Sequence, residues 1–292
     1  MAAAYVDAPV FNIASLCSGV GWLDEGVRAG LDLLGCRARP VVYVERDAYA
    51  AATLLARMDD ETVEPAPVWC GDLRDFDARP FRGLVDVLTA GLPCQPYSVA
   101  GKRRGLADHR SYGDGDGPLP NFLRIVAECR PAVVFLENVP AWIRGGFFRP
   151  FGEELCGLGY TIETPLFVSA ATVGASHRRG RAFVLAHAGG EGLAQWAGER
   201  RDDEPQCSPA ERNRIDLFAP GPSDDQWRDI LDANPHLAPA IESSVRVLAD
   251  GRSLVVDESR ADQLRCGGNG CVPLQAAAAF VELVRGVTAW PP

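Results

Sequence analysis

The first 187 residues alternate between short runs rich in valine and leucine and longer stretches with helical periodicity. This alternation constrains the fold more than any other feature, because strands joined by helices build a mostly parallel sheet that is covered on both faces. The strand-like runs are FNIASLC (11–17), PVVYVE (40–45), APVWC (66–70), LVDVLTA (84–90), PAVVFLENV (131–139), YTIETPLFVSA (160–170) and RAFVLAH (181–187). We therefore predict an α/β, Rossmann-like architecture in which ligands bind at the carboxyl ends of the strands.

The second part of the chain differs in character. Residues 188–262 contain 8 Arg and no Lys against 16 Asp and Glu, a net charge of −8, with scattered glycine and proline and no periodicity. After a glycine-rich turn, the chain then continues into an apolar, helix-like stretch. We therefore expect a first domain over 1–187, a small inserted segment over 188–264, and a C-terminal segment over 265–292 that returns to the first domain.

The cysteines and the hydropathy pattern indicate a cytoplasmic protein. The nine cysteines are scattered singly without a C-x-x-C pair, which is typical of reduced thiols and does not indicate a metal site. No apolar run approaches the roughly 18 residues of a membrane span, and the first residues lack the basic start and apolar core of a signal peptide. We therefore expect no bound metal and no membrane partner.

The net charge of −10, taken alone, argues against a protein that binds nucleic acid. Its distribution is uneven, because two basic clusters, GKRRG (101–105) and HRRGR (177–181), stand outside the acidic segment. Each cluster on its own is consistent with solvated surface or with phosphate contacts. The charge therefore leaves a nucleic-acid partner open.

A glycine-containing turn, SLCSGVGWLDEG (15–26), follows the first predicted strand and begins the first predicted helix, where doubly wound sheets bind nucleotides. Glu45 ends the second predicted strand, where an acid commonly binds ribose hydroxyls. Asp24 and Glu25 place negative charge at the helix start, which would repel a pyrophosphate but not a cationic sulfonium. The turn therefore favours S-adenosylmethionine over NAD, with Asp72 placed to accept a hydrogen bond from the adenine amino group.

One cysteine follows the fourth predicted strand in the stretch GLPCQPYS (91–98). Prolines at 93 and 96 restrict the backbone on both sides of Cys94, so that its thiol is held in one direction. Glu137 ends the fifth predicted strand, which we expect to lie beside the fourth. A thiol and a carboxyl that face one cleft indicate covalent catalysis on an electrophilic carbon, with the acid activating the ring. The alternative is two unrelated residues at strand ends.

Seven motifs occur in one order along the chain: SGVG, VERD, GDL, PCQPYS, ENV, HRRGR and GNGCVP. On these motifs, across its predicted sheet and its C-terminal helix, the chain resembles the cytosine-C5 DNA methyltransferases. The resemblance implies a class I methyltransferase fold, S-adenosyl-L-methionine as cofactor with S-adenosyl-L-homocysteine as product, and double-stranded DNA as substrate. It also implies that the acidic segment 188–264 is a target-recognition region.

The resemblance assigns catalysis to four residues. Cys94 adds to C6 of cytosine and Glu137 stabilises the base through N3, while Arg179 and Arg181 hold the base carbonyl and the thiolate region. The chemistry explains these residue types, because C5 of cytosine is a poor nucleophile until a thiolate adds at C6, and the base must leave the duplex stack to be reached. The implied cofactor contacts are Ser18, Gly19, Val20, Gly21, Trp22, Glu45, Arg46, Asp72, Leu73, Gly91, Pro93, Asn269 and Cys271, and the implied DNA contacts are Gln95, Ser98, Lys102, Arg103, Arg104 and His177.

The chain departs from the family pattern at four positions. Cys17 stands where phenylalanine is usual, and Trp22 where glycine is common. We hypothesise that the tryptophan packs against the cofactor. His177 replaces a glutamine, and Cys271 replaces a valine, which we expect to be core packing.

The segment 188–264 is small and acidic for a DNA-reading region. Its arginines Arg200, Arg201, Arg212 and Arg214 either contact DNA or lie on solvated surface. We expect a short or loosely read site and weakened general affinity, since few phosphates can be neutralised. The resemblance also implies a monomeric enzyme that acts in restriction-modification, with a cognate restriction endonuclease as partner, or in protection of phage or host DNA.

Three other functions stay open on the sequence. A tRNA cytosine-C5 methyltransferase shares the catalytic motifs, although the extra motif of that group is not found here. A non-catalytic DNA-binding relative would not need a proline-flanked thiol beside intact Glu137, Arg179 and Arg181. An NAD-dependent oxidoreductase is disfavoured by Asp24 and by the absence of a hydride-transfer site.

Overall fold

The computed structural model describes most of the first 189 residues and a second, shorter part near the end of the chain. The described residues are 8–93, 117–145, 148–175, 177–189 and 270–288, together with the backbone of two short strands at 245–247 and 253–255. These two strands, β9 (Val245–Val247) and β10 (Ser253–Val255), form an antiparallel pair. No helix among the described residues combines the length and the apolar character that a membrane span needs.

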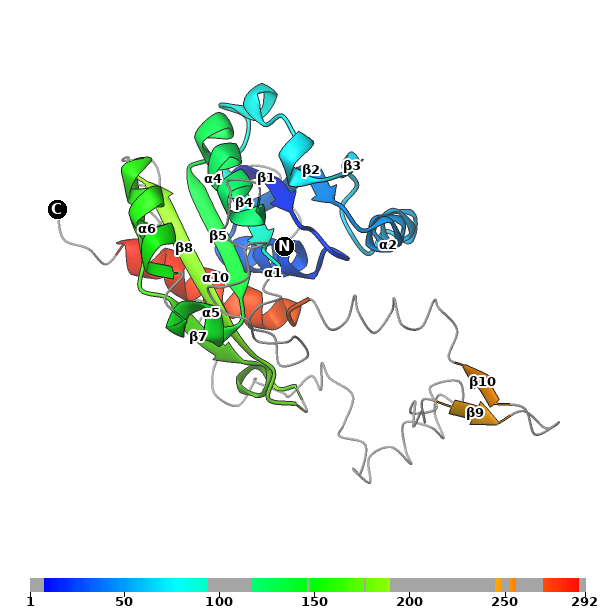
Figure 1. Cartoon of the computed structure of the whole chain (residues 1–292). Coiled ribbons are helices and arrows are strands. Elements are labelled where there is room, and N and C mark those ends of the chain that lie inside the picture. The colour runs from blue at the N-terminus through cyan, green and yellow to red at the C-terminus, as the bar shows by residue number, and fades with distance from the viewer. Residues whose placement is uncertain are drawn as a thin grey trace.

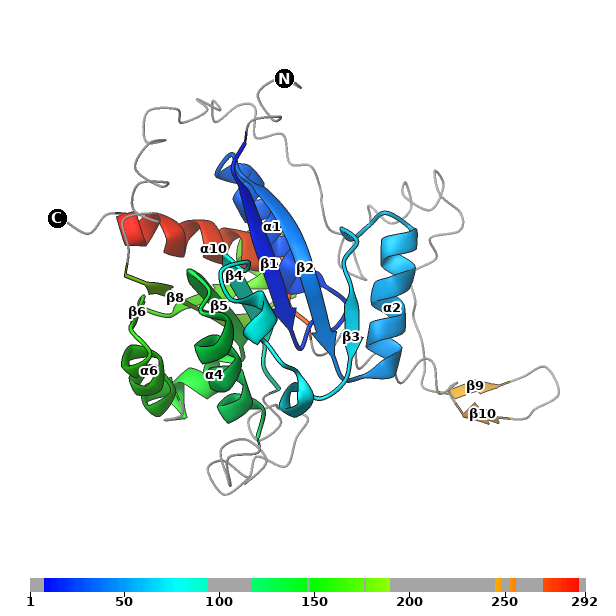
Figure 2. The same ribbon diagram turned by 90° about the horizontal axis from the view of Figure 1, so that it is seen from above.

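The predicted parallel sheet is confirmed. Five of its strands run parallel to one another: β1 (Val10–Leu16), β2 (Arg37–Glu45), β3 (Val68–Cys70), β4 (Val87–Gly91) and β5 (Val133–Asn138). With β8 (Gly180–Ala188) and β6 (Tyr160–Ile162), the strands lie in the order β3-β2-β1-β4-β5-β8-β6 (Figures 1 and 2). The chain adds β2 and β3 on one side of β1 and then crosses to add β4 and β5 on its other side. All six residues of β5 are buried, as expected of a strand that is covered on both faces.

The end of the sheet beyond β5 is antiparallel. β8 (Gly180–Ala188) pairs with β5, and both β6 (Tyr160–Ile162) and β7 (Leu166–Ser169) pair with β8. The sequence predicts one strand over 160–170, whereas the structure divides it into β6 and β7. Pro165 lies in the gap, where it has no N–H to donate to a ladder.

Helices cover the sheet on both faces (Figures 1 and 2). α1 (Trp22–Leu33) and α10 (Pro273–Thr288) pack on one face and share a hydrophobic core with β1, β5 and β8. α4 (Pro118–Cys129), α5 (Pro140–Arg144) and α6 (Phe148–Gly157) pack on the other face, and α2 (Ala48–Asp59) packs beside β2 and β3. Short 3₁₀ helices follow β3, as η2 (Leu73–Asp75) and η3 (Arg79–Phe81), and β7, as η5 (Ala170–Val173).

The contact between α1 and α10 depends on two glycines of α1. A Cβ at Gly26 would lie 2.5 Å from the carbonyl oxygen of Pro273, and a Cβ at Gly30 would lie 3.0 Å from the ring of Phe280. Side chains at these positions would therefore separate the helices. This close packing attaches the C-terminal helix to the domain that carries the glycine turn.

Candidate active site

The carboxyl ends of the parallel strands meet at one edge of the sheet. Leu16 of β1 pairs with residues of both β2 and β4, while Glu45 of β2 pairs with Cys70 of β3. Gly91 of β4 pairs with Glu137 of β5, which confirms that the fourth and fifth predicted strands are neighbours. The motifs that follow these strands therefore lie along one edge, where open α/β sheets bind their ligands.

The glycine turn after β1 has an unusual backbone. Cys17, Gly19 and Gly21 adopt the left-handed conformation, with φ of 50°, 56° and 85°. Ser18 anchors the turn to β2, because its hydroxyl accepts a hydrogen bond from the Val44 N–H at 3.1 Å and donates to Ser15. A Cβ at Gly19 would meet no heavy atom of the described residues within 4 Å. The turn thus leaves open space at Gly19, where a ligand can approach the backbone.

Glu45 supports the turn from the end of β2. Its Oε2 accepts a hydrogen bond from the Gly19 N–H at 2.7 Å, and its Oε1 accepts one from the Asp47 N–H at 2.7 Å. Each carboxylate oxygen has a second lone pair. Glu45 can therefore hold the turn and still accept hydrogen bonds from a ligand's hydroxyl groups.

Asp72 lies in the tight turn after β3. Its carboxylate accepts hydrogen bonds from the exposed side chains of Arg46 at 3.2 Å and Arg74 at 3.3 Å. Among the described residues, none accepts a hydrogen bond from the backbone N–H of Leu73. The turn thus presents a carboxylate and a neighbouring N–H, and an incoming amino group would displace one arginine from Asp72.

The structure corrects the interpretation of Asp24. The sequence predicts that its charge faces the open start of α1, whereas the carboxylate is buried and accepts hydrogen bonds from Ser15 at 2.8 Å and Thr89 at 2.5 Å. Burial raises the pKa of Asp24 to about 6, although both hydroxyl donors lower it. Glu25, beside it, pairs with Arg28 at 3.0 Å. Asp24 therefore joins β1 to β4 and supplies no argument against a pyrophosphate.

Asp24 should make folding stability depend on pH. Because the folded-state pKa is raised from 3.8 to about 6, the stabilisation is complete below pH 3.8 and is lost as pH rises through about 6, by roughly 3 kcal/mol. Asp24→Asn should remove this loss, so that the urea midpoint of the variant changes less between pH 4 and pH 7. Asp32→Asn, on the exposed side of the same helix, is the control. Parallel pH profiles for wild type and Asp24→Asn would contradict this account.

Glu137 pairs with an arginine of the next strand. Its Oε1 lies 2.5 Å from Nε of Arg181, and both side chains are largely buried. Arg181 and Arg179 also donate hydrogen bonds to one acceptor, the carbonyl oxygen of Gly270. The structure therefore brings the predicted Glu137, Arg179 and Arg181 together, and it adds a backbone acceptor from the C-terminal segment.

The carboxyl of Glu137 is partly protonated near neutral pH. Burial raises its pKa to about 7, against the opposing attraction of Arg181 and Arg179. Burial and the neighbouring Arg181 lower the pKa of Arg179. A buried carboxyl with a pKa near neutrality is suited to acid–base catalysis.

Gly91 lies between the glycine turn after β1 and the carboxyl of Glu137 at the end of β5. A Cβ at this position would be 3.7 Å from the carbonyl oxygen of Cys17, in the glycine turn, and 3.7 Å from Oε2 of Glu137. Arg181 holds the other oxygen, Oε1. A single glycine therefore separates the start of the glycine turn from the Glu137 oxygen that does not bind Arg181.

The C-terminal segment shapes the site through residues that the sequence analysis did not single out. A Cβ at Gly270 would lie 2.5 Å from the ring of Trp22, so the tryptophan covers this glycine. Gln275 is fully buried and donates to the carbonyl oxygens of Val168 at 2.9 Å and Arg179 at 2.7 Å. The one signal for Gln275 in the sequence is an amide among the apolar residues that begin this helix. Trp22 thus has a protein partner, whereas its predicted cofactor contact stays a prediction.

Other predicted site residues differ in exposure. The side chains of Val20, Leu73 and Cys271 are buried, and Cys271 lies in the core shared by α1 and α10, as expected of a packing residue. Pro93 and His177 are exposed. Seven predicted residues lie outside the described residues: Cys94, Gln95, Ser98, Lys102, Arg103, Arg104 and Asn269.

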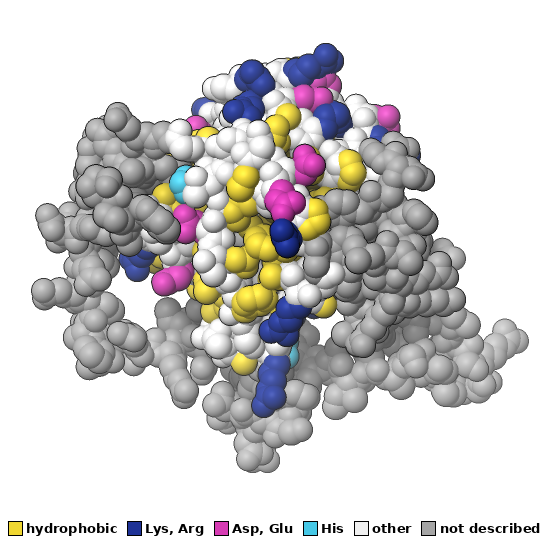
Figure 3. All heavy atoms as spheres, turned by 60° about the vertical axis from the view of Figure 1, so that its left-hand side comes forward, with side chains coloured by type: hydrophobic (Ala, Val, Ile, Leu, Met, Phe, Trp, Pro, Cys, Tyr) yellow, Lys and Arg dark blue, Asp and Glu magenta, His cyan; other side chains and the backbone are white. Residues whose placement is uncertain are grey.

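The face that carries α5, α6 and β7 is mixed in character (Figure 3). Hydrophobic side chains run down its middle, and Arg side chains lie at the top and in the lower half of this view. On these elements, Arg144 lies over the ring of the exposed Phe167, 5.4 Å from its centroid. Arg178, in the predicted basic cluster, is also exposed. Basic groups therefore lie on the surface close to the start of β8.

Comparison with known proteins decides the family. The model of the C-5 cytosine-specific DNA methylase family matches residues 11–232, which is most of this chain. The chain belongs to the C-5 cytosine-specific DNA methylase family. The match includes the glycine turn, Glu45, Asp72, Glu137 and both arginines of the site.

Several relatives match this chain, and the share of the relative's own length that the match covers differs among them. The Type II methyltransferase M.Eco47II of Escherichia coli is 30% identical over 61% of this chain and 39% of its own length. M.NlaX of Neisseria lactamica is 35% identical over 60% of this chain and 52% of its own length. M.AquIA of a Picosynechococcus species is 29% identical over 81% of this chain and 93% of its own length. The chain thus spans about half or less of the first two relatives and nearly all of the third.

Proposed function

We propose that this chain transfers a methyl group from S-adenosyl-L-methionine to C5 of cytosine in double-stranded DNA. The observation that carries the proposal is the position of Gly91, 3.7 Å from both the glycine turn and the Glu137 carboxyl when a Cβ is placed there. A methyl donor on the turn and a base on the carboxyl would then face each other across one residue. Family membership supports the same reaction.

The residues at the edge fit the proposed cofactor. Gly19 offers open space beside the backbone, Glu45 has lone pairs for ribose hydroxyls, and Asp72 with the Leu73 N–H offers an acceptor and a donor to adenine. Bound there, S-adenosyl-L-methionine supplies the methyl group. Ser18, Val20, Gly21, Trp22, Arg46, Pro93, Asn269 and Cys271 complete the set that we propose around it.

The chain's own residues would prepare the base. The thiolate of Cys94 adds at C6 of a cytosine that has left the duplex, which makes C5 nucleophilic. Glu137, whose pKa is raised to about 7 by burial, stabilises the ring through N3 in its acid form. Arg181 fixes the orientation of that carboxyl through Oε1. After transfer, water accepts the C5 proton, the electrons of the C5–H bond re-form the C5=C6 double bond, and the C6–S bond breaks to release the Cys94 thiolate. The proton at N3 returns to Glu137, which restores the free enzyme.

We extend the proposal to the rest of the chain. Residues 188–264 read the DNA target, residues 1–187 carry catalysis, and residues 265–292 complete the site. Gln95, Ser98, Lys102, Arg103, Arg104 and His177 contact the DNA. The Type II names of the relatives support a role in restriction-modification. We further propose a monomeric, cytoplasmic enzyme with a cognate endonuclease as partner, and protection of phage or host DNA would use the same reaction.

Methyl transfer can be measured directly. The purified chain is incubated with methyl-labelled S-adenosyl-L-methionine and either mixed-sequence duplex DNA or tRNA, and the digested nucleosides are separated. We expect label in 5-methyl-2′-deoxycytidine from DNA and none in tRNA. Label only in tRNA, label on an exocyclic nitrogen, or no label in DNA would each contradict the proposed function.

A further inference from the structure

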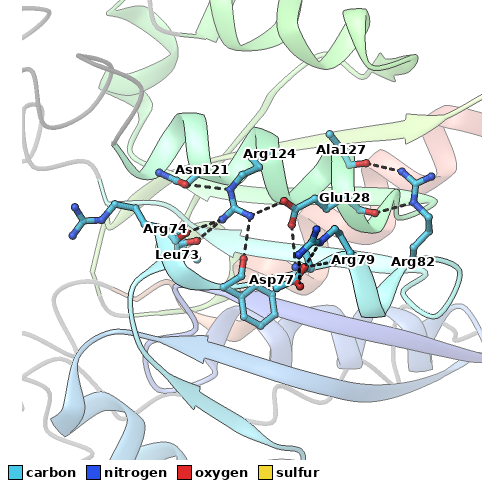
Figure 4. Close-up of polar contacts among 11 residues, drawn as sticks. Leu73, Arg74, Asp77, Arg79, Arg82, Asn121, Arg124, Ala127 and Glu128 are labelled. Atoms are coloured by element: carbon cyan, nitrogen blue, oxygen red, sulfur yellow. Dashed lines mark hydrogen bonds and ion pairs between the residues drawn. The ribbon is translucent and has the colours of Figure 1, made fainter.

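A group of polar side chains on α4 contacts the turn that carries Asp72 and Leu73 (Figure 4). Arg124 is at its centre: its Nη2 donates to the carbonyl oxygen of Leu73 at 2.6 Å, and its Nη1 donates to that of Phe76 at 3.0 Å. A guanidinium has five donors in a fixed plane, so two carbonyls that share it are fixed relative to each other. Arg124 therefore sets the shape of the turn from outside it.

The guanidinium of Arg124 is itself held in place. Its Nη1 donates to Oε1 of Glu128 at 2.8 Å, and its Nε donates to Oδ1 of Asn121 at 3.3 Å, both on α4. Glu128 also accepts a hydrogen bond from the Ala78 N–H at 3.0 Å through its other oxygen. Two side chains of α4 thus contact the segment after β3: Arg124 binds the turn at 73–76, and Glu128 binds Ala78 beyond it. The direction of the Arg124 side chain is restricted by Asn121 and Glu128.

The start of the same turn is fixed by packing. The ring of Trp69 covers Gly71, because a Cβ there would lie 2.5 Å from the ring. Trp69 also packs edge-on against Phe76, with centroids 5.4 Å apart. Asp72 and Leu73 therefore lie between two fixed points, the covered glycine and the carbonyls bound by Arg124.

The groups of the turn that can bind a ligand are those whose direction Arg124 controls. The Leu73 carbonyl that binds Arg124 belongs to the residue whose N–H has no acceptor among the described residues. Asp72 is bound to the exposed Arg46 and Arg74, and not to Arg124. Removing Arg124 would therefore leave the ligand-binding atoms of Asp72 and Leu73 in place, but the backbone that carries them would no longer be held in one orientation.

We propose that Arg124 is a positioning residue for adenine recognition, which aligns the Asp72 carboxylate and the Leu73 N–H with the adenine edge of the cofactor. This inference rests on the proposed function, because it takes S-adenosyl-L-methionine as the ligand of the turn. Arg124 acts through the backbone of the turn and needs no contact with the cofactor.

The test compares two ligands that differ in one group. Calorimetry gives the dissociation constants of S-adenosyl-L-homocysteine and of its analogue without the adenine 6-amino group, for wild type, Arg124→Gln, Arg124→Lys and Arg82→Gln. Wild type should prefer the amino compound by on the order of 10-fold, as expected of a hydrogen bond to a charged acceptor. Arg124→Gln should weaken both ligands, because both keep the ring nitrogen that can accept from the Leu73 N–H, but it should weaken S-adenosyl-L-homocysteine more, so that most of the preference is lost. Arg124→Lys should retain part of the preference.

Arg82→Gln is the matched control. Arg82 donates to the α4 carbonyls of Glu128 at 2.9 Å and Ala127 at 2.8 Å, so it fastens the same helix without binding the turn at 72–76. It should keep the wild-type preference, with thermal melting confirming that each variant is folded. An unchanged preference in Arg124→Gln, or an equal loss in Arg82→Gln, overturns the inference. Wild type that binds neither ligand overturns the proposed cofactor itself, which is a distinguishable result.

Discussion

Glu137→Gln is expected to lower methyl transfer to DNA by about 10²- to 10⁴-fold, the range of a positioned general acid, while the affinity for S-adenosyl-L-homocysteine stays unchanged. Glutamine keeps the shape of the side chain and can still accept the hydrogen bond from Arg181. It has no acidic proton, whereas burial raises the pKa of the wild-type carboxyl to about 7. Single-turnover rates and calorimetry separate the two effects.

The pH profile adds a second readout for Glu137. Because its pKa is raised to about 7, the acid form is lost as pH rises through that value, so wild-type kcat/KM should have a limb that falls above it. Glu137→Gln should lack this limb. Glu163→Gln is the control, since Glu163 forms a half-buried pair with His187 at 3.3 Å and is not part of the proposed site. A Glu137→Gln enzyme with the wild-type rate and profile would contradict the role of Glu137.

Gly270→Ala is expected to lower methyl transfer by about 10²-fold, the effect of a displacement of about 1 Å in a catalytic group. The new Cβ would lie 2.5 Å from the ring of Trp22, so the backbone at residue 270, the ring or both must shift, and we expect the backbone to take part because the ring is bulky. Its carbonyl oxygen accepts hydrogen bonds from Arg179 and Arg181, and Arg181 binds Glu137. The displacement is therefore transmitted to the carboxyl.

A second change should reverse much of this loss. Trp22→Ala removes the ring that the new methyl group meets, so the double variant with Gly270→Ala should be faster than Gly270→Ala alone. The rates are compared at saturating S-adenosyl-L-methionine, because Trp22 is also a proposed cofactor contact. Gly286→Ala, on the C-terminal helix α10, is the control, because among the described residues its Cβ would meet no atom within 4 Å. If Gly270→Ala were fully active, or if Trp22→Ala made it slower still, the proposed path from the C-terminal segment to the arginines would be wrong.

The mostly parallel sheet, the neighbouring positions of its fourth and fifth predicted strands, and the position of Glu137 could be predicted from the sequence. Buried Val- and Leu-rich runs at helix-length spacing allow few arrangements other than a parallel sheet, and parallel strands end at a common edge. Residues at or just beyond the carboxyl ends of such strands, such as Glu45, Asp72 and Glu137, must then lie on that edge. These features could be predicted because they depend on the alternation of strand and helix segments and on their order along the chain.

The direction of individual side chains could not be predicted in the same way. Asp24 begins a helix in sequence, but two hydroxyls from β1 and β4 draw its carboxylate into the interior. The approach of Gly270 to Trp22 joins positions far apart in the chain. Arg124 likewise reaches the Leu73 carbonyl from another element. Such contacts depend on tertiary packing, which leaves no local period in the sequence.

The most direct measurement of the central claim is a covalent trap. The chain is incubated with S-adenosyl-L-methionine and a mixed-sequence duplex in which 5-fluorocytosine replaces cytosine, and because fluorine at C5 cannot leave as a proton, the thiol stays bound at C6 after methyl transfer. The account predicts a denaturation-resistant protein–DNA complex whose linked peptide contains Cys94, and no such complex for Cys94→Ala. A complex that survives in Cys94→Ala, or methylation of ordinary DNA without any trapped complex, would contradict it.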